Sequence, residues 1–140
     1  MLVIDASVAL SAALTRDGFD RIAGHDLVAP PLMWSEAVST LREHAWRGDI
    51  SAEQAATSLA ALMAAPIRKR APRRLHREAW LVAEQLGWAK TYDAEYVALA
   101  RLLGCRLLTR DDRLRRGAAR AVETIGPTEL EQPAKSSGLT

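Results

Sequence analysis

Short apolar runs alternate along the chain with longer segments of helical periodicity. The longer segments place apolar residues three or four positions apart, which is the spacing of one helical face. The pattern predicts strands over Leu2–Ile4, Leu27–Ala29, Arg106–Thr109 and Ala121–Ile125, with a basic edge strand within Ile67–Pro72. It predicts helices over residues 6–14, 18–24, 32–47, 51–65, 74–86 and 92–103. Strands that alternate with helices indicate an α/β fold, an α/β/α sandwich whose short, mostly parallel central sheet is flanked by helices.

Residue types at the segment ends indicate where individual helices begin and end. Ser51 and Gln54 form the pattern Ser-x-x-Gln of a capping box, which predicts a helix start. Gly87 and Gly104 follow two apolar stripes and predict helix ends. We expect the following residues of these helices to pack in the core: Ala55, Leu59, Leu62, Met63, Trp80 and Trp88. The tryptophans form no aromatic ladder of the kind that stacks single-stranded bases.

Aspartates stand directly after two of the predicted strands. Asp5 follows the first strand, and Asp111 and Asp112 follow the strand over residues 106–109. Asp93 lies on the inward-looking stripe of the preceding helix, whereas periodicity does not place Glu36. The carboxyl edge of a parallel sheet is where sites are built. Each aspartate also has a purely structural interpretation, because a carboxylate caps or favours a helix N-terminus.

Carboxylates that meet at one edge repel each other, so at neutral pH they share protons, attract a cation or bind a metal. The chain has no His-x-x-His or Cys-x-x-Cys spacing, and its histidines, His25, His44 and His76, are scattered. An all-oxygen ligand set favours Mg²⁺ or Mn²⁺ over Zn²⁺. Arginine-rich stretches over residues 68–77 and 110–120 fit either a phosphate-rich partner or a solvated surface. Together these features favour the hydrolysis of a phosphodiester.

Composition narrows the class of protein. The 140 residues are 49% apolar with a net charge of +2, which excludes disorder and suits one domain. No apolar run is long enough for a bilayer, and Asp5 interrupts what would be a signal peptide. The single cysteine, Cys105, borders an apolar strand and is expected to be a buried, inert thiol. These features predict a cytoplasmic protein.

Four motifs in this order resemble one known family. They are VIDASVAL at residues 3–10, PPLMWSEAVSTL at 30–41, TYDAEYVALA at 91–100 and LLTRDDRL at 107–114, followed by IGPTEL. As a set they resemble the PIN-domain ribonucleases, and within them the VapC toxins of bacterial toxin–antitoxin pairs. The resemblance covers residues 1–130 as a PIN-like nuclease domain and leaves residues 131–140 as a predicted flexible tail.

The resemblance implies a set of site residues. The family's four acids fall on Asp5, Glu36, Asp93 and Asp111, which would be the catalytic and metal-binding residues. It further implies that Ser7 and Thr109 support the site by hydrogen bonds, and Asp112 is a candidate for a water-mediated contact.

The resemblance also implies a function. The chain would be a divalent-metal-dependent endoribonuclease that uses Mg²⁺, with Mn²⁺ as a substitute. A cognate VapB-like antitoxin would silence it by laying its C-terminal segment over the acidic pocket, and the toxin would form a homodimer. One alternative is a non-cleaving PIN-fold module that binds RNA or protein. Another is an aspartyl-phosphate protein, either a receiver or a phosphatase. It fits poorly, because a phosphatase needs a second aspartate where Ser7 stands and a receiver needs adjacent acids there and a lysine after a late strand.

Overall fold

Five short parallel strands form the central sheet of residues 1–130, the part of the chain that the computed structural model describes. They are β1 (Leu2–Ile4), β2 (Leu27–Ala29), β3 (Ile67–Lys69), β4 (Arg106–Leu108) and β5 (Thr124–Ile125), in the order β3-β2-β1-β4-β5. Ile4 pairs with Leu108, so the residues that follow β1 and β4 lie at the same edge of the sheet. The predicted α/β/α fold class and the basic edge strand are confirmed, although β4 and β5 are shorter than predicted. The predicted tail, residues 131–140, lies outside the described residues.

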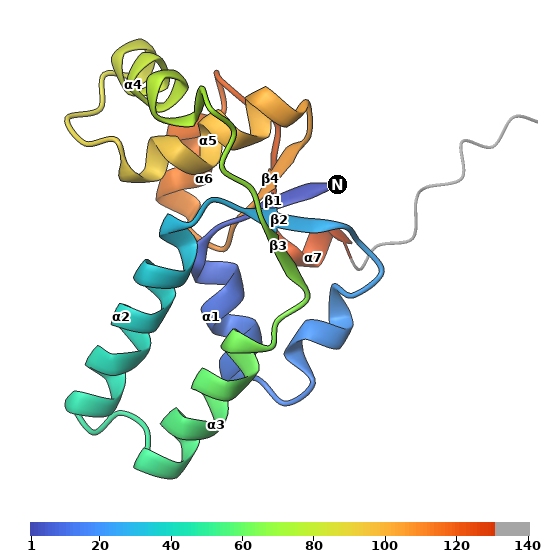
Figure 1. Cartoon of the computed structure of the whole chain (residues 1–140), viewed down its shortest axis with the longest axis vertical. Helices are drawn as coiled ribbons and strands as arrows, with labels where there is room; N and C mark the ends of the chain where they lie inside the picture. Colours follow the sequence, from blue (N-terminus) through green and yellow to red (C-terminus); the bar gives the residue numbers. More distant parts are fainter. Residues whose placement is uncertain (131–140) are drawn as a thin grey trace, which may run out of the picture.

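Helices cover both faces of the sheet. They are α1 (Ala6–Leu14), α2 (Leu32–Trp46), α3 (Ala52–Met63), α4 (Leu75–Leu86), α5 (Tyr92–Leu103), α6 (Asp112–Ala118) and α7 (Pro127–Leu130), with the 3₁₀ helix η1 at Gly18–Arg21. Helices α1, α2 and α3 pack against one another on one side, and α4 and α5 pack together on the other (Figure 1). In residues 1–130 no helix has both the length and the hydropathy of a membrane span.

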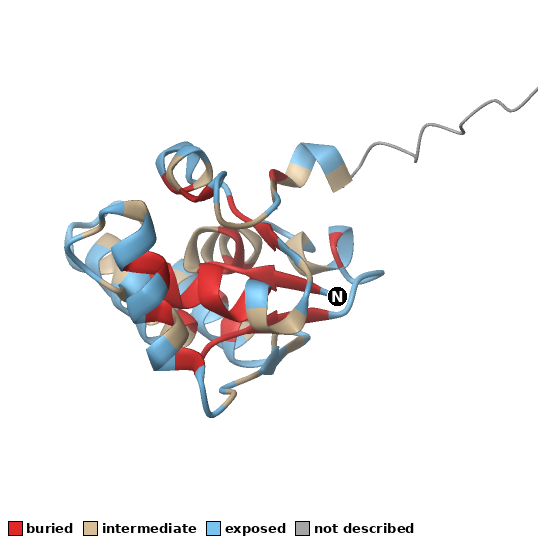
Figure 2. Cartoon of the chain, turned by 90° about the horizontal axis from the view of Figure 1, so that it is seen from above, coloured by how far each residue is buried: buried red, intermediate tan, exposed pale blue. Residues whose placement is uncertain are grey.

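The core lies between the two helical layers and includes the three central strands. Figure 2 shows the buried residues gathered along the sheet and the helices next to it. Helix α5 is buried over seven consecutive residues, Ala94 to Ala100, so it packs on all sides rather than along one stripe. A helix enclosed in this way holds its first turn, which carries Asp93, in a fixed position.

Three of the predicted core residues are exposed. Leu59 and Met63 of α3 are 40% and 55% exposed, and Trp80 of α4 is 65% exposed. Leu62 is fully buried and Trp88 packs against the core, as predicted. The prediction was wrong for the first three because periodicity identifies an apolar face but does not say how much of it another helix covers.

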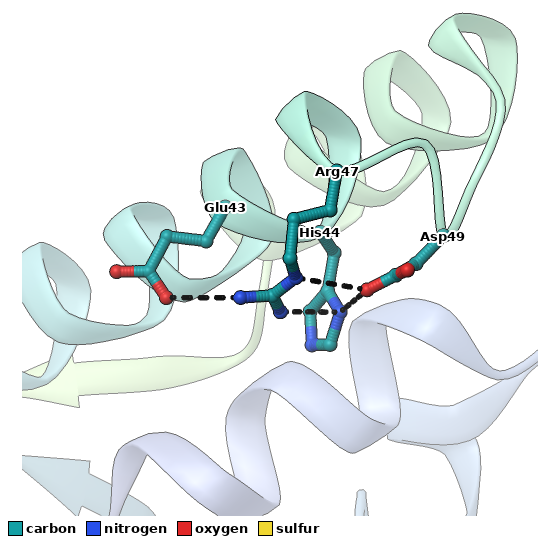
Figure 3. A network of polar contacts seen from close by, with 4 residues as sticks. All are labelled: Glu43, His44, Arg47 and Asp49. Carbon is teal, nitrogen blue, oxygen red and sulfur yellow. Dashed lines mark hydrogen bonds and ion pairs between the residues drawn. The ribbon is translucent and has the colours of Figure 1, made fainter.

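The turn between α2 and α3 is held by polar contacts at the protein surface. The carboxylate of Asp49 lies 3.1 Å from His44 Nδ1 and 3.2 Å from Arg47 Nε, and Glu43 lies 3.9 Å from Arg47 (Figure 3). Exposed pairs of this kind contribute little to stability, because solvent screens their charges. Only half of the predicted capping box forms, since Ser51 Oγ accepts a bond from the backbone N–H of Gln54 whereas the Gln54 side chain donates to Ser58.

Candidate active site

Asp5 is the buried centre of the site. It is 4% exposed, it follows β1 directly, and its Oδ1 accepts the N-cap bond from the Val8 N–H at 3.2 Å. The Ser7 hydroxyl donates to Oδ1 at 2.6 Å, and the Thr109 hydroxyl donates to Oδ2 at 2.5 Å. Both interpretations of Asp5 therefore hold together, because it caps α1 and also lies at the carboxyl edge of the sheet.

The two hydroxyl groups link Asp5 to the loop after β4. Arg110 N–H donates to Ser7 Oγ at 3.0 Å, and Asp111 N–H donates to Thr109 Oγ1 at 3.0 Å. Each hydroxyl has one hydrogen, and the short contacts to Asp5 use both of them. The 3.5 Å approach of Ser7 Oγ to Thr109 Oγ1 is therefore a close contact and not a hydrogen bond. The chain of bonds runs from two backbone amides through the hydroxyls to one carboxylate.

Glu36 is held by a tyrosine from another helix. The hydroxyl of Tyr96, a residue of α5 that is 1% exposed, donates to Glu36 Oε1 at 2.6 Å. Burial and the neighbouring Glu36 raise the pKa of Tyr96 far above its usual value, so the phenol stays protonated and acts as a donor. Glu36 itself comes from α2 and is partly buried.

Glu36, Asp93 and Asp111 line a single cavity of about 620 Å³. Asp111 caps α6, since its Oδ1 accepts bonds from the Arg113 and Leu114 N–H groups at 2.9 and 3.2 Å. Two cationic residues, Lys90 and Arg113, also line this cavity. The cavity thus combines three acids with a basic wall.

Electrostatic interactions connect the four acids in pairs. Burial raises the pKa of Asp5, Glu36 and Asp93 above the ordinary carboxyl values. In addition, the charge of Asp111 raises the pKa of both Asp5 and Asp93, and the charges of Asp93 and Asp5 raise that of Glu36. The structure therefore brings all four predicted acids to one edge of the sheet.

The chemistry of this donor set fits a hard divalent cation, because it offers carboxylate oxygens and neither histidine nor cysteine. In the conformation described for residues 1–130, however, no three Asp, Glu, His or Cys side chains lie close enough to hold one ion. Asp5 and Glu36 instead accept hydrogen bonds from hydroxyl groups, and one oxygen of Asp111 caps α6. Asp112 is exposed and does not line the cavity.

Comparison with known proteins gives the family. The PIN domain family model matches residues 2–120. The VapC ribonuclease Mb0985 of Mycobacterium bovis and the ribonuclease VapC9 of Mycobacterium tuberculosis are each 38% identical to this chain over 130 residues, covering 91% of it and 99% of theirs. The chain belongs to the VapC ribonucleases of the PIN-domain family. The resemblance read from its motifs is thereby confirmed.

Solved structures share the fold of this VapC chain. PAE2754 from Pyrobaculum aerophilum superposes with a TM-score of 0.70 at 25% identity, and 92% of each chain is covered. FitAcB from Neisseria gonorrhoeae superposes with a TM-score of 0.54 at 16% identity, with 91% of this chain and 99% of the other covered. At 16% identity, the similarity to FitAcB shows a shared fold and nothing more.

Sequence reasoning did not identify Tyr96 as a residue of the site. Helical periodicity places Tyr96 on the apolar face of α5, but it does not show that the Tyr96 hydroxyl orients Glu36. A signal was available, because a tyrosine on an inward face needs a partner for its hydroxyl group.

Proposed function

We propose that this chain is a Mg²⁺-dependent endoribonuclease that hydrolyses phosphodiester bonds in RNA and acts as the toxin of a toxin–antitoxin pair. The observation that carries the proposal is the convergence of Asp5, Glu36, Asp93 and Asp111, from four separate segments, in and beneath one cavity. Burial raises the pKa of Asp5, Glu36 and Asp93, and the charges of neighbouring acids raise it further; a bound cation would offset this repulsion.

In this proposal the four acids hold the ion, with Mn²⁺ as a substitute for Mg²⁺. When bound, such an ion lowers the pKa of a coordinated water and neutralises a phosphoryl oxygen. The chain's own residues fix the geometry. Ser7 and Thr109 orient Asp5, Tyr96 orients Glu36, and the basic wall of the cavity attracts the substrate backbone.

The test is cleavage of RNA by Asp93→Asn compared with wild type. Asp93 is exposed in the cavity, so the amide leaves the fold intact and removes one negative charge from the site. We expect a loss of cleavage greater than the roughly 10- to 100-fold that follows loss of an outer metal partner. The matched control is Glu84→Gln, an equally conservative change at an exposed position of α4, which should cleave normally.

Two outcomes would contradict the proposal. Full cleavage by Asp93→Asn would show that the acid cluster is not the active site. If wild-type protein binds RNA but cuts none in either Mg²⁺ or Mn²⁺, the chain is instead a non-cleaving binding module. Growth inhibition on expression, lost in Asp93→Asn, tests the toxin role separately.

The proposal includes a cytoplasmic protein with two protein partners, namely a VapB-like antitoxin and a second copy of this chain. The similarity to VapC ribonucleases supports the antitoxin partner. Light scattering of the purified chain, alone and with the antitoxin, measures both assemblies. A monomer at all concentrations would contradict the homodimer.

A further inference from the structure

An exposed aromatic side chain stands beside the acids. Tyr92, the first residue of α5, is 59% exposed and lines the cavity next to Asp93. Its neighbour Trp88 also lines the cavity, but it packs against the core, and its ring closely approaches Gly117. Packing within residues 1–130 therefore explains the position of the Trp88 ring, but it does not explain why the side chain of Tyr92 is exposed.

Two cations accompany this aromatic residue. Lys90 precedes it by two positions, Arg113 comes from α6, and both line the same cavity. Across the part of the chain that the structure describes, neither makes an ion pair with an acid. The charge of Arg113 nevertheless lowers the pKa of Asp93, which places it near the acids without neutralising it in a salt bridge.

We propose that Tyr92 is a stacking platform for one unpaired base of the substrate, and that Lys90 and Arg113 hold the adjoining phosphates. This inference rests on the proposed ribonuclease function and assigns to Tyr92 the recognition of an unpaired nucleotide. A tyrosine ring can stack only on a base whose face is free, whereas both faces of a base inside an RNA helix are covered. Cations without acidic partners provide the complementary contact to the backbone.

The arrangement also determines where the platform acts. Tyr92 and Asp93 are consecutive residues at the start of one helix, and both line the same cavity. A base stacked on Tyr92 therefore belongs to a nucleotide close to the scissile phosphate. This contact aligns the strand over the acids and excludes double-stranded regions from cleavage.

The experiment measures RNA binding in EDTA, so that the result does not depend on metal or on cleavage. The probe is a short, fluorescein-labelled single-stranded RNA of mixed sequence, and the readout is fluorescence anisotropy. We expect Tyr92→Ala to raise Kd roughly 5- to 100-fold, the loss typical of one stacked base. Tyr92→Phe keeps the ring and should bind like wild type. The matched control, Trp80→Ala, removes an aromatic residue that is 65% exposed but lies outside the cavity, and it should leave Kd unchanged.

A substrate change isolates stacking from other effects of the mutation. One abasic nucleotide is placed at each position of the RNA in turn. At one position the abasic nucleotide should weaken RNA binding by the wild-type protein about as much as the Tyr92→Ala substitution does. At that same position it should not weaken RNA binding by the Tyr92→Ala variant any further. Replacing Lys90 by methionine should reduce the slope of log K against log salt by about 0.7, the value for one contact to a single strand.

Three results would overturn the proposal: unchanged Kd in Tyr92→Ala, equal loss in Tyr92→Phe, or equally tight wild-type binding of duplex RNA. Cleavage by wild-type protein in Mg²⁺ is measured in parallel. If cleavage occurs but Tyr92→Ala binds normally, the platform is wrong and the nuclease stands. If the platform behaves as expected and no RNA is cut, the nuclease proposal fails instead.

Discussion

Replacing Thr109 by valine would test whether the hydroxyl groups hold the site together. The two side chains have nearly the same shape, so the change leaves no cavity. It removes the hydrogen bond from Thr109 to Asp5 Oδ2 and the acceptor for the Asp111 N–H. Because Asp5 is 4% exposed, water does not readily replace the lost donor. The variant therefore leaves a buried carboxylate with fewer hydrogen bonds.

The magnitude follows from the two lost bonds. A bond to a charged acceptor contributes about 1.5–3 kcal/mol, and a bond between neutral groups contributes about 1 kcal/mol. We expect the free energy of unfolding to fall by roughly 2–4 kcal/mol at pH 7.5. For a domain of this size that corresponds to a fall in Tm of roughly 10 °C.

The pH dependence provides a second check. Burial raises the pKa of Asp5 and the hydroxyl bonds lower it, so removing Thr109 Oγ1 raises this pKa further. In the folded variant the Asp5 carboxyl group therefore stays protonated to a higher pH than it does in the unfolded chain. The free energy of unfolding of the variant falls as the pH rises between these two pKa values. The difference between variant and wild type should therefore be smaller at pH 5 than at pH 7.5.

The assay is urea unfolding followed by circular dichroism, in EDTA, at both pH values. The matched control is Thr57→Val at an exposed position of α3, which should change stability little. The reasoning would be refuted if Thr109→Val matched wild type at pH 7.5, or if its deficit grew as the pH was lowered.

Three further predictions concern the metal, a helix end and a surface turn. Mg²⁺ should raise the Tm of wild-type protein at pH 7.5 and raise it less at pH 5, because protons compete with the ion for carboxyl groups with a raised pKa. If Mg²⁺ raised the Tm of Asp93→Asn as much as that of wild type, this prediction would be contradicted. Gly104→Ala should lower the free energy of unfolding, measured with urea, by about 1 kcal/mol. The reason is that α5 ends at Gly104, whose φ of +63° lies in the left-handed region. An unchanged free energy of unfolding would contradict this left-handed helix end. Asp49→Asn should cause a small loss of thermal stability, because His44 and Arg47 stabilise the ionised form of Asp49 and lower its pKa. This loss should disappear when the pH falls below that lowered pKa. A loss of thermal stability that persists in acid would have another cause.

The sequence was sufficient to predict the elements whose signals are local. The apolar run of Leu2–Ile4 ending at Asp5, and the turn at Gly104, follow from periodicity and from the needs of the backbone. The convergence of Asp5 and Asp111 was predictable as well, because parallel strands present their carboxyl ends at one edge.

Features that depend on contacts between distant segments were not predictable from periodicity. The direction of Glu36 is set by Tyr96, 60 residues away, and only the family resemblance had selected this glutamate. Met63 and Trp80 were expected in the core, but the extent to which other helices cover an apolar face depends on packing, which no local pattern encodes. Tyr92 likewise became informative only when its exposure and its place in the cavity were known.

The bond between Thr109 and Asp5 joins residues 104 positions apart, and it forms only when β4 pairs with β1. Strand β1 pairs with β2 on one side and with β4 on the other, and only the β4 side brings Thr109 to Asp5. A partly folded state in which β4 has not yet paired with β1 therefore lacks the hydrogen bonds that order the acidic centre. Assembly of this centre depends on long-range sheet formation and not on any one local segment.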